Sequence, residues 1–176
     1  MIKKFENFGN KSVVIYHGLG SKPAPVRSLI LKRLGYDVIS ELFDYESEWN
    51  LDKGKSLFEN QLEIVKNADL IIGISFGGYL AYNLAKSENK PLILINPALD
   101  RDKSKTNIKH FDISYIPHKI DIEVFLGEND VSIPKEITID FLNKTNDNFT
   151  YNIIHKMEHR IPDEFFRQII KQSRLI

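Results

Sequence analysis

The chain has 176 residues, 42 % of them hydrophobic and 27 % charged, which is the composition of an ordinary globular protein of one domain. Lysine plus arginine and aspartate plus glutamate number 24 each, so no strong electrostatic field favours nucleic acid or an anionic membrane as a partner. The sequence has no cysteine, which excludes disulfides, thiolate metal sites and a cysteine nucleophile.

The first segment, MIKKFENFGNKS, has basic residues but no apolar run behind them, so no secretory signal is expected. No apolar stretch approaches the roughly 20 residues that a membrane-spanning helix needs. Together with the absence of cysteine, these features lead us to expect a cytoplasmic protein with no membrane partner.

Short apolar runs alternate with longer amphipathic stretches along the rest of the chain. In chain order they predict strand 12–17, helix 24–35, strand 36–43, helix 55–67, strand 69–75, helix 77–87, strand 91–96, strand 120–127, helix 134–144, strand 149–155 and helix 162–173. Nearly all-apolar strands separated by helices are typical of a parallel sheet covered on both faces. We therefore expect the α/β class, as a single domain over 1–176 with a mostly parallel sheet of about six strands.

Residues 73–77, Gly-Ile-Ser-Phe-Gly, place a serine between two glycines where a predicted strand meets a predicted helix. A serine hydroxyl becomes a good nucleophile when an imidazole takes its proton and a carboxylate orients that imidazole. Flanking glycines allow a sharp turn that exposes the hydroxyl at the carboxyl edge of the sheet. Ser75 is therefore the candidate nucleophile, and the alternative is a serine that caps the helix from Gly77.

The carboxylate and the imidazole should follow the serine in that order, each in a loop after a strand. Asp130 comes three residues after Gly127, at the end of strand 120–127, and His159 follows strand 149–155. Taken alone, Asp130 is a turn or capping aspartate and His159 a solvated loop histidine. Their joint occurrence in this order favours a triad of Ser75, His159 and Asp130.

Acyl transfer also needs hydrogen-bond donors for the oxyanion of the tetrahedral intermediate. The backbone N–H of Phe76, directly after the serine, is predicted to be one donor. The backbone N–H of Leu19, in the glycine-containing loop YHGLGSKP (16–23), is predicted to be the other. His17 in this loop precedes the serine in the chain, so it is interpreted as a structural hydrogen-bonding residue and not as the base. Tyr45 and Trp49 are interpreted as residues that pack under the loop, and the alternative is that they line a substrate pocket.

Five segments occur in the order found in α/β-hydrolases: HGLGSKP, GISFGGYLA, INPAL, GENDVSIP and MEHRIP. From about residue 12 to 172 the chain resembles the small YqiA-like esterases, which share these segments. The resemblance implies a minimal α/β-hydrolase that lacks the first strands of the larger enzymes, uses Ser75, Asp130 and His159 as its triad and needs no cofactor. One departure is that His159 follows Met157 and Glu158, where a small residue is more usual.

Two other functions compete. The segment HKMEH (155–159) matches the zinc signature H-x-x-E-H, but such histidines must lie one helical turn apart, and this segment follows a predicted strand. The second competitor is a catalytically inactive binding protein with the same fold.

His110 and His118 flank Asp112 in a polar stretch, which is more typical of solvated histidines than of a metal site. We expect no metal.

The expected substrate is a small soluble ester or thioester. Larger lipases shelter long acyl chains under an insertion that would fall at 100–119, a polar stretch expected to form an irregular surface excursion. Its apolar residues are too few to enclose a long alkyl chain; they are Ile108, Phe111, Ile113, Tyr115 and Ile116. Esters, thioesters and amides pass through the same oxyanion, so the triad does not choose among them. The sequence indicates no oligomeric state.

Overall fold

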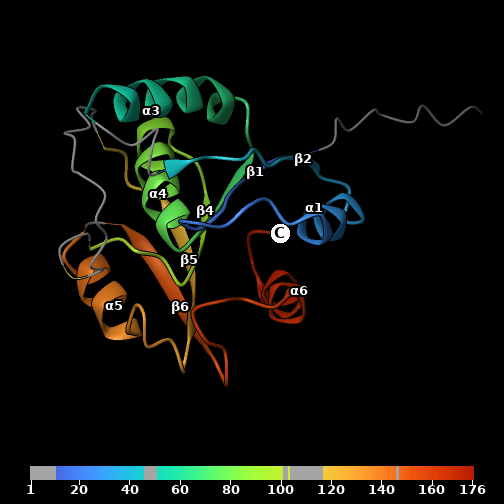
Figure 1. Ribbon diagram of the computed structural model, residues 1–176, viewed down its shortest axis with the longest axis vertical. Helices are drawn as coiled ribbons and strands as arrows, with labels where there is room; N and C mark the ends of the chain where they lie inside the picture. The colour runs from blue at the N-terminus through green and yellow to red at the C-terminus, as the bar shows by residue number, and fades with distance from the viewer. Residues whose placement is uncertain (1–10, 46–50, 101–102, 104–116, 146) are drawn as a thin grey trace, which may run out of the picture.

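The computed structural model describes residues 11–45, 51–100, 103, 117–145 and 147–176, and the side chains of 51–55 are not described (Figure 1). The strands within these residues are β1 (Ser12–Tyr16), β2 (Asp37–Ile39), β3 (Leu70–Ile74), β4 (Leu92–Ile95), β5 (Asp121–Gly127) and β6 (Asn148–Ile154). The helices are α1 (Pro25–Lys32), α3 (Leu51–Lys66), α4 (Phe76–Glu88), α5 (Lys135–Asn143) and α6 (Asp163–Gln172).

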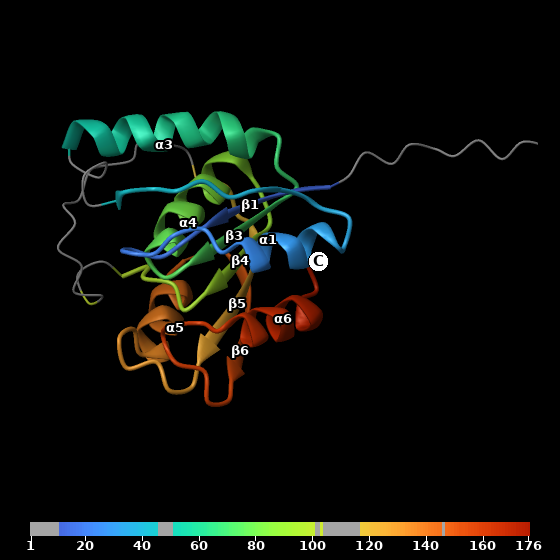
Figure 2. The ribbon, with the colours of Figure 1, turned by 45° about the vertical axis from the view of Figure 1, so that its right-hand side comes forward.

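The six strands form one sheet in the order β2-β1-β3-β4-β5-β6, and every neighbouring pair is parallel. Figure 2 shows the strands from β1 to β6 in this order across the molecule. The carboxyl ends of parallel strands all lie at one edge of the sheet. Loops that are far apart in the sequence therefore meet there, and ligand sites of open α/β sheets occupy this edge.

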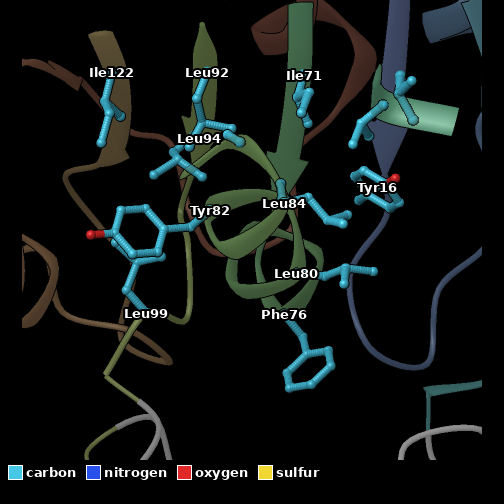
Figure 3. Close-up of a cluster of buried hydrophobic side chains, with 14 of the residues drawn as sticks. Tyr16, Ile71, Phe76, Leu80, Tyr82, Leu84, Leu92, Leu94, Leu99 and Ile122 are labelled. Carbon is cyan, nitrogen blue, oxygen red and sulfur yellow. The ribbon is translucent and has the colours of Figure 1, made fainter. Parts of the chain in front are cut away.

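Helices cover both faces of the sheet: α3, α4 and α5 lie on one side, and α1 and α6 on the other (Figure 1). Successive strand residues alternate between the two faces. Ile71 belongs to the apolar cluster under α4, whereas Ile72 belongs to the cluster under α1 and α6. Figure 3 shows the first cluster, with side chains of α4 packed against those of the strands: Tyr16, Ile71, Phe76, Leu80, Tyr82, Leu84, Leu92, Leu94, Leu99 and Ile122.

The structure contains every helix and strand that the sequence predicts, and the bounds differ by more than three residues at two places. Strand β2 has three residues where 36–43 was predicted, because only Asp37–Ile39 pair with β1. Helix α3 begins at Leu51, four residues before the predicted start at 55. Most of the predicted excursion at 100–119 lies outside the described residues, as does Trp49. No helix among the described residues is long and apolar enough to cross a membrane.

A buried ion pair joins α4 to the start of β6, at the edge of the sheet opposite to the carboxyl ends. Lys86 Nζ lies 2.7 Å from Asp147 Oδ1, and the two side chains are 11 % and 0 % exposed. Asp147 also accepts a hydrogen bond from the Tyr82 hydroxyl at 3.0 Å. A charge left alone in such a place keeps its desolvation penalty without the compensating attraction.

We expect Asp147→Asn to lower the free energy of unfolding by about 3 kcal/mol, because it leaves Lys86 charged and unpaired while keeping an acceptor for Tyr82. Urea denaturation measures the change. Glu63→Gln is the matched control, since it removes one partner of the exposed pair Glu63–Lys66 and should have little effect. Equal losses in the two variants would contradict the prediction.

Candidate active site

Ser75 lies in the sharp turn between β3 and α4. Its φ of 52° and ψ of −124° place a non-glycine residue in a strained region of the backbone. The turn brings α4 directly against β1: a Cβ on Gly77 would lie 2.5 Å from the Tyr16 carbonyl oxygen. Ser75 makes no side-chain capping hydrogen bond to the helix, so the hydroxyl is not used in the way that the capping alternative requires.

The structure brings Ser75, His159 and Asp130 together in one hydrogen-bonded chain. Ser75 Oγ lies 2.8 Å from His159 Nε2, and His159 Nδ1 lies 2.8 Å from Asp130 Oδ2. An ionised carboxylate can only accept, so Nδ1 carries the proton and Nε2 is left as the acceptor for the serine hydroxyl. This tautomer is the one that a general base needs.

Asp130 is both a turn aspartate and the partner of the histidine. Its Oδ1 accepts the backbone N–H groups of Ser132 at 2.9 Å and Ile133 at 2.8 Å. Its Oδ2 faces His159, and the Asp130 side chain is 1 % exposed. The turn therefore fixes the carboxylate before it meets the imidazole. Asp130 therefore fits both interpretations from the sequence, since Oδ1 belongs to the turn and Oδ2 contacts the histidine.

Met157, two residues before His159, anchors the loop of the histidine through its side chain and its carbonyl. Its side chain is fully buried in the cluster under α1 and α6. The Met157 carbonyl accepts the N–H of Asn129 at 3.0 Å, which ties the histidine loop to the loop of Asp130. Met157 departs from the small residue expected here, and its burial explains why a large apolar side chain fits.

The loop after β1 passes beside Ser75, where an oxyanion hole would be needed. A Cβ on Gly18 would lie 3.1 Å from Ser75 Cβ, so Gly18 allows the loop to approach this closely. Leu19 follows directly and packs partly buried against the cluster under α4. Phe76 is the first residue of α4, where helix N–H groups have no partner within the helix. The predicted donors Leu19 and Phe76 thus come from two segments that flank Ser75.

His17 lies in the same loop but has a structural position. Its Nε2 accepts the N–H of Phe43 at 2.9 Å, and its Nδ1 contacts the Gly18 carbonyl at 2.9 Å. The Tyr45 hydroxyl donates to the His17 carbonyl at 3.0 Å, and the Tyr45 side chain is buried. These contacts agree with the interpretation of His17 and Tyr45 as structural and packing residues.

The H-x-x-E-H segment does not form the geometry of a zinc site. Strand β6 ends at Ile154, and residues 155–160 are not helical, with Lys156 at a φ of 61°. The ring of His155 is directed to Glu128 and that of His159 to Ser75 and Asp130. No group of three or more potential metal ligands occurs among the described residues.

Asn96 is a site residue whose role sequence reasoning missed. It follows β4 directly, has a φ of 44° and is 1 % exposed. Its side chain hydrogen-bonds to backbone groups of the loops that carry Asp130 and His159. The only signal in the sequence was the Asn-Pro pair at the end of a predicted strand, which is also a common loop sequence.

No family model matches the sequence, and no curated protein matches it significantly. Solved structures do match. Est1E from Butyrivibrio proteoclasticus is 16 % identical, with a TM-score of 0.68 over 95 % of this chain and 88 % of that one. A serine hydrolase without a lid from Xanthomonas campestris is 16 % identical, with a TM-score of 0.61 over 91 % of this chain and 78 % of that one. The chain has the α/β-hydrolase fold.

A monoacylglycerol lipase from Paleococcus ferrophilus is also similar, at 15 % identity and a TM-score of 0.65 over 93 % of this chain and 95 % of that one. At such identities the likeness establishes the α/β-hydrolase fold, which confirms the fold predicted from the sequence. The narrower resemblance to YqiA-like esterases stays a prediction.

Burial lowers the pKa of His17, and the contact with the Gly18 carbonyl opposes this effect only in part. The folded protein therefore holds His17 neutral at a pH where the unfolded chain, with a histidine pKa of about 6.5, begins to bind a proton. Stability from this residue is complete above pH ~6.5 and is lost as the pH falls toward the pKa in the folded state.

We expect the stability advantage of the wild type over His17→Gln to shrink between about pH 7.5 and 5.5. Glutamine offers an acceptor for the Phe43 N–H but does not titrate. Urea denaturation of both proteins across this range gives the difference, and the other four histidines are common to both chains. A difference that is constant with pH would contradict the prediction.

Proposed function

We propose that this protein is a serine hydrolase of the esterase type that cleaves a small soluble ester or thioester through an acyl-enzyme on Ser75. The observation that carries the proposal is the hydrogen-bonded chain from Ser75 Oγ through His159 to Asp130, with 2.8 Å at both links. The α/β-hydrolase fold and the hydrolases among the similar structures support the same chemistry.

In the first half-reaction, Ser75 Oγ attacks the carbonyl carbon of the substrate while His159 Nε2 takes the hydroxyl proton. Asp130 stabilises the imidazolium that forms, because its Oδ2 already accepts the Nδ1 proton. The carbonyl oxygen becomes an oxyanion, which the backbone N–H groups of Leu19 and Phe76 are proposed to bind. When the intermediate collapses, His159 gives the proton to the leaving alcohol or thiol, and the acyl group stays on Ser75.

In the second half-reaction, water takes the place of the leaving group. His159 Nε2 removes a proton from the water as the water oxygen attacks the acyl carbon. A second oxyanion forms at the same position and collapses, which breaks the bond to Ser75 Oγ. His159 returns the proton to Ser75, and the carboxylic acid leaves. Both half-reactions use the same three side chains, so one geometry serves the whole cycle.

The competing function is a binding protein that has kept the fold and lost the chemistry. Such a protein has no reason to keep a strained serine within hydrogen-bond distance of a histidine that a buried carboxylate orients. A fluorophosphonate probe separates the two functions, since it labels an activated serine and leaves a binding protein unlabelled.

We expect Ser75→Ala to abolish hydrolysis of p-nitrophenyl acetate, with a loss in kcat on the order of 10⁶. His159→Ala should be nearly as damaging, because the two residues act as one unit. The fluorophosphonate should label the wild type at Ser75 and fail to label Ser75→Ala. Circular dichroism and thermal unfolding establish that the variants are folded.

His155→Ala is the control for these variants. His155 is 76 % exposed and contacts Glu128, so its loss should change kcat by no more than about twofold. Wild-type hydrolysis by folded Ser75→Ala would overturn the proposal. Loss of activity in His155→Ala with retention in His159→Ala would mean that the base is the wrong histidine.

The proposed substrates have short acyl groups. Strand β4 ends at Ile95 and β5 begins at Asp121, so a cap between them has at most the residues 96–120, of which the mostly polar stretch 100–119 is the larger part. Each methylene that is buried contributes about 0.8 kcal/mol, so an acyl chain left in water gains little affinity from added length. The similar Xanthomonas hydrolase without a lid supports an open site.

We expect kcat/KM for p-nitrophenyl esters to be highest at acyl groups of about two to four carbons and to level off or fall beyond them. A series from acetate to decanoate, each below its solubility limit, measures the preference. A steady rise out to about eight carbons or more would show a longer apolar binding groove than we propose.

A further inference from the structure

Asn96 connects two loops that are far apart in the sequence. Its side-chain Oδ1 accepts the N–H of Gly127 at 2.7 Å. Its Nδ2 donates to the Glu158 carbonyl at 2.9 Å and is 3.4 Å from the His159 carbonyl. A backbone N–H needs an acceptor and carbonyls need a donor, so these partners fix the orientation of the amide.

The two loops are those of the candidate acid and the candidate base. Gly127 ends β5 three residues before Asp130, and Glu158 directly precedes His159. One buried side chain thus contacts both segments from inside, in addition to the backbone hydrogen bonds from Asn129 to Met157 and from Glu128 to Ile154. Apart from the contact of His159 with Asp130 itself, the side chains of Glu128 and His155 also pair between the loops, but they lie at the surface, where such pairs contribute little.

The backbone around Asn96 also holds the turn of the nucleophile. The N–H of Ser75 donates to the Ile95 carbonyl at 3.0 Å, and the N–H of Ala98 donates to the Ser75 carbonyl at 3.0 Å. Residues 95–98 therefore contact the segments of all three candidate catalytic residues. Replacing Asn96, within this segment, should therefore change the distances among Ser75, Asp130 and His159.

Asparagine suits this position for two separate reasons. Its φ of 44° lies in the left-handed region, which asparagine tolerates better than most residues. Its amide offers one acceptor and two donors within short reach of the backbone. Aspartate shares the shape but has no donor, so it would place an oxygen against the Glu158 carbonyl.

We propose that Asn96 is a positioning residue, which holds the loops of Asp130 and His159 at the spacing that lets the imidazole reach Ser75. The inference rests on the proposed function, because it assigns Asn96 a role in that reaction. Asn96 acts through His159 and Asp130 and has no part in the bond-making steps.

Two variants distinguish the contact of Asn96 with Gly127 from its contact with Glu158. Asn96→Gly removes both side-chain contacts and tolerates the positive φ. Asn96→Asp keeps the acceptor for Gly127 and loses the donor to Glu158. We expect kcat for p-nitrophenyl acetate to fall about 10- to 100-fold in both, with KM within about twofold of the wild type, because a misplaced base slows chemistry more than it weakens binding.

A second readout does not depend on activity. The Nδ1 proton of His159, held by Asp130, should give a low-field proton NMR signal in the wild type. We expect this signal to shift or broaden in Asn96→Gly and in Asn96→Asp, since the distance between the two loops is no longer fixed. A contribution to global stability alone would leave the signal of the folded protein unchanged.

Asn89 provides the matched control. It is also an asparagine with positive φ, at 51°, and it caps the C-terminus of α4 at the opposite edge of the sheet. Asn89→Gly and Asn89→Asp should leave kcat and the low-field signal as in the wild type. They control for the loss of an asparagine from a left-handed backbone position.

The outcomes distinguish this inference from the proposed function. Wild-type hydrolysis by Ser75→Ala would overturn the function, and the NMR comparison would still test the position of His159. Folded Asn96 variants with wild-type kcat and an unchanged low-field signal would overturn the inference, as would equal effects of the Asn89 variants. Failure of both Asn96 variants to fold would also count against it, because the role of Asn96 would then be in stability.

Discussion

The turn at Ser75 is the constraint on which the rest of the site depends. Helix α4 starts one residue after the serine, so close to β1 that Gly77 has no room for a side chain beside the Tyr16 carbonyl. That approach holds the serine at a φ of 52°, and the strain is sustained by the burial of α4 against the sheet. Because Phe76 and Leu80 anchor the helix in the core, the packing that stabilises the fold also sets the position of the hydroxyl (Figure 3).

The parallel sheet brings the other two residues to the serine. Strands β5 and β6 end at the same edge as β3, so the loops after Gly127 and Ile154 reach the turn without long connections. The opposite edge carries the buried pair of Lys86 and Asp147, which contributes to stability and lies away from the chemistry. The fold therefore places this stabilising ion pair away from the residues proposed to react.

The element order and the three candidate residues were predictable because each has a local signature. Strands buried on both faces are continuous apolar runs, and Ser75 and Asp130 each follow such a run. His159 follows β6, whose residues are mostly exposed, so its signature was the order serine, acid, histidine after successive strands. The extent of β2 was not predictable, because it depends on pairing with β1 and on the contact between Phe43 and His17. The role of Asn96 was not predictable either, since its hydrogen-bond partners lie 31 and 62 residues away in the sequence.

Asp130 illustrates why a local turn signature and a proposed catalytic role need not compete. The turn uses Oδ1 and the histidine uses Oδ2, so the hydrogen bonds that make Asp130 a turn residue also orient its second oxygen. A carboxylate fixed in this way needs no reorganisation when the imidazole becomes charged. Asn96 extends the same principle to the distance between the loops, because backbone groups of both are bound by one buried amide. Hydrogen bonds to the backbone thus orient the Asp130 carboxylate and join the segments that carry Asp130 and His159.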